Sequence, residues 1–262
     1  MDQQSNILKS SSNHADLNPL SDSKSYGINK RMPVSVSSLG LLKIRKDYIS
    51  MFSFFRKNLA SENVYLRIAT TCFLFVVIFF TITTISYFFL PEGILRTKNP
   101  VQNWDTSNNV LASALQIFLF NQLSVVMILF GNTFSSRKNL EQNYLPIGYL
   151  AFFTQILINA VTLGTWSFSV VTEAVHLLDR IMGTFDALHR AGLWEMGGQL
   201  LILCATAKMS IIMTDGNKTS VRSWKEVRLS KQEVFIFGGG LIFMLIGAFI
   251  ESFSIINLGN IR

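Results

Sequence analysis

Residues 68–90 read IATTCFLFVVIFFTITTISYFFL, a run of apolar and hydroxyl side chains that contains no charged residue. Pro91 follows directly and closes the run, because proline cannot be accommodated inside a regular helix. The hydrocarbon core of a bilayer is about 30 Å thick, and about 20 helical residues cross it. The stretch therefore predicts a membrane-spanning helix.

The composition of the whole chain agrees with this prediction. Hydrophobic residues make up 49% of the 262 residues and charged residues only 15%, whereas a soluble domain carries about 25% charged residues. The chain is therefore short of the polar surface that a water-soluble protein needs. We expect an all-α polytopic membrane protein of about five transmembrane helices, with a cytoplasmic amphipathic helix and an outer interfacial helix.

Four further apolar runs are long enough to be spans: 110–134, 145–171, 193–213 and 234–258. Those at 110–134 and 193–213 contain several polar side chains, and we expect them to span because the bundle needs them. The last run contains Glu251 in its second half.

Lysine and arginine are concentrated in alternate connections, which predicts the orientation of the spans. The basic connections hold Lys43, Arg45, Lys46, Arg56, Lys57 and Arg67, then Arg137 and Lys138, and then Lys218, Arg222, Lys225, Arg228 and Lys231. We expect a multi-pass protein of the cell (cytoplasmic) membrane, with its N-terminus in the cytoplasm and its C-terminus outside. Topology thus explains the net charge of +7, and no nucleic-acid motif accompanies these charges. We expect no nucleic-acid partner.

Three segments are predicted along the chain. Residues 1–40 are rich in serine and asparagine and should form a disordered cytoplasmic tail. Residues 41–62 should form a basic amphipathic juxtamembrane helix, and residues 63–262 the transmembrane helical bundle. The basic side chains expected to meet the membrane surface are Lys43, Arg45, Lys46, Arg56 and Lys57. Packing of this helix against the bundle, or docking of a partner helix on it, is the alternative.

A second amphipathic stretch, TEAVHLLDRIMGTFDALHR at 172–190, is expected outside the membrane. Its apolar side chains at three- and four-residue steps are Val175, Leu178, Met182, Phe185 and Leu188. We interpret it as an interfacial or re-entrant helix. His176, Asp179 and His189 are too few and too scattered for a metal site, which needs three or four ligands with an orienting surrounding shell.

Ionisable groups inside the apolar runs are the main functional candidates, because burying them in lipid is costly. Glu251 lies roughly 10 Å from the outer end of its run, too deep for a glutamate to reach water, so it must be neutral, paired or in a wet cavity. Glu195 lies in the same outer half, whereas Lys208 lies near the cytoplasmic end and can reach water there. Partners for the two acids could be Asn121, Gln122 and Asn132. The acids either fix helix register by hydrogen bonding or bind a cation or proton.

No enzyme is predicted. The chain lacks the H-E-x-x-H, G-x-S-x-G and G-x-x-x-x-G-K-[ST] motifs, and we expect no cofactor.

Three stretches resemble the stage II sporulation protein M family of multi-pass membrane proteins. They are FNQLSVVMILFGN at 120–132, GLWEM at 192–196 and IGAFIESF at 246–253. Their order and spacing match over roughly residues 65–260, and their glycines, expected to permit close packing, are Gly131, Gly192 and Gly247. Members of the family often have Pro-His-Gly directly before the glutamate stretch, whereas here Ala191 precedes Gly192 and the nearest histidine is His189. The paired asparagines of the family are Asn121 and Gln122 in this chain.

The resemblance implies a non-enzymatic scaffold or assembly subunit of a membrane complex, in envelope remodelling or beside an exporter. The expected partners are the lipid bilayer and other membrane or envelope proteins, with a separate ATPase subunit or a second copy of the chain as further candidates. The alternative is a permease subunit of an ATPase-driven exporter, or an ion-coupled carrier that uses Glu195 and Glu251.

Overall fold

The computed structural model describes residues 51–96, 107, 109–137, 143–167, 175–185, 191–216 and 218–259. The predicted tail and the first part of the juxtamembrane helix, with Lys43, Arg45 and Lys46, lie outside the described residues, as do His189 and Leu188. The described chain is mostly helical, which confirms the all-α prediction.

Three helices are long and apolar enough to cross a membrane: α2 (Val64–Phe89), α3 (Val110–Asn132) and α7 (Lys231–Gly259). They correspond to the first, second and last predicted runs, and they support the prediction of a membrane protein. The runs at 145–171 and 193–213 become the shorter helices α4 (Gly148–Gly164), of 17 residues, and α6 (Ala191–Thr206), of 16 residues. The count of five spans stays a prediction.

Asparagine side chains begin two of the long helices. Asn63 accepts a hydrogen bond from the backbone nitrogen of Tyr65 at 2.9 Å, and Asn109 accepts one from that of Leu111 at 2.9 Å. Such caps satisfy backbone N–H groups that have no partner inside the helix.

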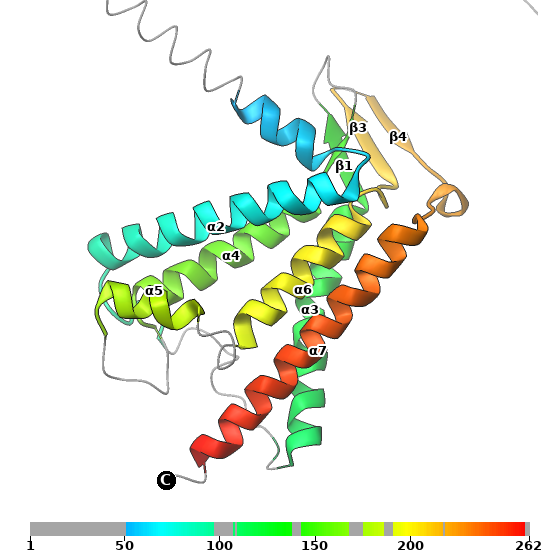
Figure 1. The fold of residues 1–262 in the computed structure, drawn as a ribbon. Coiled ribbons are helices and arrows are strands. Elements are labelled where there is room, and N and C mark those ends of the chain that lie inside the picture. The colour runs from blue at the N-terminus through cyan, green and yellow to red at the C-terminus, as the bar shows by residue number, and fades with distance from the viewer. Residues whose placement is uncertain are drawn as a thin grey trace, which may run out of the picture. The chain divides into compact units, whose positions relative to one another are not determined.

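The short helix α6 packs against all four of the other bundle helices, α2, α3, α4 and α7 (Figure 1). Its residues Ile202, Leu203, Cys204 and Ala205 have no exposed surface. Because protein surrounds α6, it can carry polar side chains that a lipid-facing helix could not.

A small sheet, which the sequence analysis did not predict, lies at one end of the bundle (Figure 1). Its strands β1 (Phe134–Arg137), β2 (Leu145–Pro146), β3 (Ile212–Asp215) and β4 (Lys218–Val221) have the order β2-β1-β3-β4. The central strands β1 and β3 are parallel, with Phe134 opposite Ile212, and each outer strand is antiparallel to its neighbour. We call this end of the bundle the sheet end. A short 3₁₀ helix, η2 (Trp224–Glu226), links β4 to α7.

The order helix–strand–strand–helix therefore occurs twice, as α3–β1–β2–α4 and as α6–β3–β4–α7. Helices α3 and α6 are the matching first helices of these two units. Asn121 is hydrogen-bonded to Glu195, and Asn132 to Thr206, each pair being 74 residues apart. A constant offset over 11 residues, about three helical turns, means that α3 and α6 run parallel and in register.

Glycines set the closest helix contacts. A Cβ atom added at Gly131 would lie 2.8 Å from the Cα of Gly148, so α3 and α4 touch through backbone. One added at Gly240 would lie 2.7 Å from the carbonyl oxygen of Gly198, where α7 crosses α6. This close contact at Gly131 supports a packing role, which stays a prediction. At Gly192, by contrast, an added Cβ would meet nothing within 4 Å, which corrects the prediction made for that residue.

The described part of the juxtamembrane helix, residues 51–59, docks by its C-terminal end. Leu59 is buried, and its carbonyl accepts a hydrogen bond from the Tyr149 hydroxyl at 3.0 Å. Arg56 donates to the carbonyl of Ser136 at 2.9 Å, whereas Lys57 is exposed. This end of the helix therefore packs against the bundle. Its first turn exposes Met51, Phe52 and Phe54.

Candidate functional site: a carboxyl pair between three helices

Glu195 lies in the first half of α6, on the face toward α3. The amide nitrogen of Asn121, near the middle of α3, donates a hydrogen bond to Oε1 of Glu195. The sequence analysis had named Asn121 as one of three partner candidates for the acids, and this contact makes it the partner of Glu195.

Glu251, in the last third of α7, completes the site. Its carboxyl lies beside that of Glu195, close enough for the two groups to interact by a side-chain hydrogen bond and through their charge. An ionised carboxylate can only accept hydrogen bonds, so a bond between two carboxyls needs a proton on one of them. Two ionised carboxylates placed side by side would repel each other strongly. Glu251 therefore has another acid as its neighbour, and the expectation that it is neutral, paired or in a wet cavity stays a prediction.

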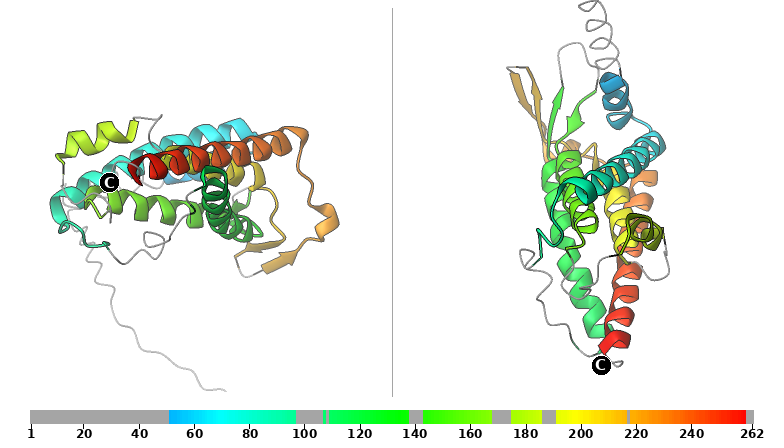
Figure 2. Two further views of the ribbon diagram at one scale, coloured as in Figure 1. Left: turned by 90° about the horizontal axis from the view of Figure 1, so that it is seen from below. Right: turned by 90° about the vertical axis from the view of Figure 1, so that its left-hand side faces the viewer.

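Gly247 allows this approach. It lies one turn before Glu251 on α7, and a Cβ atom added to it would stand 3.0 Å from Cγ of Glu195 and 3.1 Å from Cβ of Trp194. This close contact at Gly247 supports a packing role, which stays a prediction. Next to the site, the Ser252 hydroxyl donates to the carbonyl of Val110 at 2.9 Å and fixes α7 to the start of α3. Helices α3 and α7 run side by side in the right-hand view of Figure 2.

No positive side chain on the surrounding helices neutralises this pair. Helices α3 and α4 contain no charged residue, and Glu195 is the only one in α6. The charged residues of α7 besides Glu251 are Lys231 and Glu233 in its first turn, roughly 30 Å of helix rise away. Among the residues that the structure describes, these helices offer the pair no fixed positive charge, and a proton or a small mobile cation can balance it.

Gln199 adds an unused oxygen to the same region. It lies one turn after Glu195 on the same face of α6, and only 2% of its surface is exposed. Its Oε1 is buried and has no hydrogen-bond partner in the described part of the chain. We call Asn121, Glu195, Gln199 and Glu251 the carboxyl site.

The remaining polar candidates lie elsewhere. Gln122 donates to the carbonyl of Phe118 in its own helix at 3.2 Å. Asn132, fully buried, donates to Oγ1 of Thr206 at 2.8 Å and to the carbonyl of Leu203 at 3.3 Å, near the sheet end. Lys208 follows α6 and forms an ion pair with Glu62, as its predicted position near a span end allows. The structure thus brings Asn121 to the acids and keeps the other three away from them.

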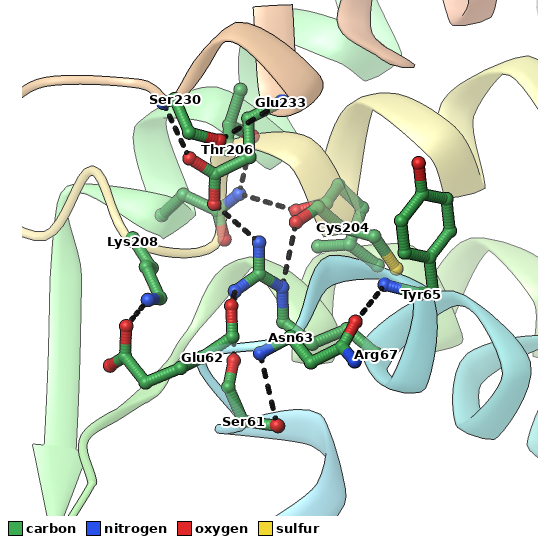
Figure 3. Close-up of polar contacts among 12 residues, drawn as sticks. Ser61, Glu62, Asn63, Tyr65, Arg67, Cys204, Thr206, Lys208, Ser230 and Glu233 are labelled. Carbon is green, nitrogen blue, oxygen red and sulfur yellow. Dashed lines mark hydrogen bonds and ion pairs between the residues drawn. The ribbon is translucent and has the colours of Figure 1, made fainter.

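A buried arginine at the sheet end escaped the sequence analysis, which had counted Arg67 only as a topology charge. Its side chain is 1% exposed, and Nη2 lies 2.6 Å from Oε1 of Glu233 (Figure 3). Nε donates to the carbonyl of Cys204 at 3.0 Å and Nη1 to that of Ser61 at 2.8 Å. The arginine therefore joins the start of α2, the end of α6 and the start of α7.

Glu233 is held in place by a capping box with Ser230, also drawn in Figure 3. Oε2 of Glu233 accepts from the Ser230 backbone nitrogen at 2.8 Å, and the Ser230 hydroxyl accepts from the Glu233 backbone nitrogen at 3.2 Å. The pattern Ser-x-x-Glu before an apolar run is the sequence signal that could have located this acid.

A second buried arginine fixes the amphipathic helix α5 (Leu177–Phe185). Arg180 is 2% exposed, and its guanidinium lies 2.8 Å from Glu92 and stacks over the rings of Tyr87 and Trp166. Leu178 and Met182 of the predicted apolar face are exposed. The helix thus docks through its arginine and turns these apolar side chains away from the bundle.

Comparison with known proteins finds no protein-family model, no curated protein and no solved structure that matches the chain. The resemblance to the stage II sporulation protein M family stays a prediction.

Proposed function

We propose that this chain is a non-enzymatic integral membrane protein that acts as a scaffold or assembly subunit of a membrane complex, in the manner that its resemblance to the stage II sporulation protein M family implies. The observation that carries the proposal is what the buried charged side chains of this chain contact. The charged side chains that are fully buried among the described residues, Arg67, Arg180 and Glu233, all tie segments of the chain to one another. Charge in the interior thus serves to hold a framework together.

The surface of α3 supports the same proposal. Leu111, Leu115, Leu119, Leu123 and Met127 follow one another at four-residue steps and are exposed. Because each four-residue step turns by about 40° around the axis, these residues form an apolar stripe that winds around the helix and is available to lipid or to the helices of partner proteins. Other membrane or envelope proteins, a separate ATPase subunit or a second copy of this chain are the partner classes to test.

Copurification tests the proposal directly. The tagged full chain is solubilised from its own membranes in mild detergent, and the proteins that accompany it are identified by mass spectrometry while the mass of the particle is measured. The scaffold proposal predicts a complex of defined composition that changing Leu119 and Leu123 to serine disperses without lowering the melting temperature. A chain that runs alone as a monomer in several detergents contradicts it.

A second candidate function is ion-coupled transport, alone or as the permease partner of an ATPase. The observation that favours it is the position of the carboxyl site between the two helix–strand–strand–helix units, since transporters built from repeats bind substrate and coupling ion where the repeats meet. The variant Glu251→Gln separates the two functions. Loss of ion-driven flux in proteoliposomes with the complex intact favours transport, and dispersal of the complex without measurable flux favours the scaffold.

A further inference from the structure

We propose that Asn121, Glu195, Gln199 and Glu251 form a binding site for one exchangeable monovalent cation, which is either a proton shared by the two carboxyls or a sodium ion that replaces it. This inference goes beyond the scaffold proposal and does not depend on it. Three independent features of the structure carry it.

The first feature is the contact between the carboxyls. Glu195 and Glu251 come from different helices, their carboxyls lie side by side, and a hydrogen bond between two carboxyls requires a bound proton. Asn121 donates to Glu195, which leaves its own amide oxygen as a further ligand atom.

The second feature is the absence of a fixed counter-charge. The faces toward the pair come from α3, α6 and α7, and the only charged residues of these helices near the pair are the two glutamates themselves. Helix α4, which also packs on α3 and α6, contributes none. Losing the proton without a replacement would leave two negative charges in an apolar bundle, so another cation must take its place.

The third feature is Gln199. A buried amide oxygen without a donor costs about 1–3 kcal/mol, and a cation bound by this oxygen would offset that cost. Gln199 follows Glu195 by one helical turn. Amide and carboxylate oxygens are hard ligands, the kind that suits hard cations. The carboxyl pair and the amides of Asn121 and Gln199 together offer a small cluster of oxygen atoms.

Infrared spectroscopy of the purified full chain tests the proposal. At about pH 7 an exposed glutamate is ionised, so the carbonyl band of a protonated carboxyl reports the buried pair. Spectra are compared between sodium chloride and choline chloride of equal ionic strength. A band present equally in both salts identifies the cation as a proton, and a band that sodium weakens identifies a site where sodium replaces the proton.

The double variant Glu195→Gln/Glu251→Gln is expected to abolish the band and each single variant to shift it, and Glu226→Gln, at an exposed acid in η2, is the matched control that should leave it unchanged. If sodium weakens the band, Gln199→Met should reduce that effect several-fold while keeping the band itself. Absence of the band in both salts from a chain that melts cooperatively overturns the proposal. So does a band that survives unchanged in the double glutamine variant.

Discussion

Arg67 and Glu233 are 166 residues apart in the chain, yet the guanidinium of one lies 2.6 Å from the carboxylate of the other, with the arginine almost fully buried. This ion pair closes the bundle at the sheet end. The carboxyl site occupies the same helices α6 and α7 nearer their opposite ends. Polar contacts therefore hold helix α6 near both of its ends. The proposed exchangeable cation lies at the carboxyl site, at the end away from Arg67.

Breaking the Arg67–Glu233 pair should be costly. The change Glu233→Gln keeps the shape of the side chain but leaves the arginine charge buried without a counter-ion, so the free energy of unfolding should fall by about 3–5 kcal/mol. Thermal unfolding in detergent measures the loss. The control is Asp215→Asn, which breaks the pair between Arg137 and Asp215, whose side chains are 33% and 30% exposed. A loss for Glu233→Gln no larger than that of this control would contradict the account.

The amide of Asn121 should stabilise the α3–α6 contact. Changing Asn121 to leucine removes the donor to Glu195, and an interhelical hydrogen bond of this kind is worth about 1–2 kcal/mol. The neighbouring Gln122→Leu removes only a bond to the carbonyl of Phe118 in the same helix and should have a smaller effect. Equal melting temperatures for the two variants would show that the contact with Glu195 is not made.

The crossing of α6 and α7 should tolerate no side chain at Gly240. An added methyl group would stand 2.7 Å from the backbone oxygen of Gly198, so Gly240→Ala should cost about 1–3 kcal/mol of stability. A methyl group added at Gly239, the preceding residue, would meet nothing within 4 Å, so Gly239→Ala should leave the stability unchanged. Thermal melting of the two variants side by side makes the comparison, and an equal loss in both would contradict the packing described.

The pair between strands β1 and β3 predicts a pH effect outside the membrane. A hydrogen bond from Arg137 lowers the pKa of Asp215 below its usual value. The stabilisation is therefore present above the ordinary aspartate pKa of about 3.9 and is lost as the pH falls through the lower folded value. Arg137→Gln should raise the pKa of Asp215, which carbon NMR of labelled aspartate can follow. An unchanged titration would show that the pair does not form in solution.

Much of the framework could be predicted from the sequence. The long runs at 68–90, 110–134 and 234–258 correspond to α2, α3 and α7, because length and hydropathy are local properties. The placement of Glu195 and Glu251 at similar depth followed from helical rise alone, and their contact agrees with it. The separation of Lys208 from both acids followed in the same way.

Other features depend on contacts between distant residues. The strands β1 and β3 are four residues each and mix polar and apolar side chains, and each pairs with a segment 78 residues away, as Phe134 does with Ile212. The burial of Arg67 and Arg180 was missed because counting basic residues in loops gives the side of the membrane and not the depth of each side chain. Gly192 lies in a motif with Glu195, but motif membership carries no information about what the residue packs against.

The central claim is that Glu195 of α6 and Glu251 of α7 meet inside the bundle, and cysteine cross-linking tests it most directly. In a background with Cys72 and Cys204 replaced by serine and alanine, Glu195→Cys is combined with Glu251→Cys and treated with a short bifunctional thiol reagent in native membranes. The control combines Glu195→Cys with Phe253→Cys, since Phe253 is exposed on α7. We predict that the 195–251 pair is linked within one chain, far faster than the control. A pair that reacts no faster than the control, or that links only between chains, would contradict the account.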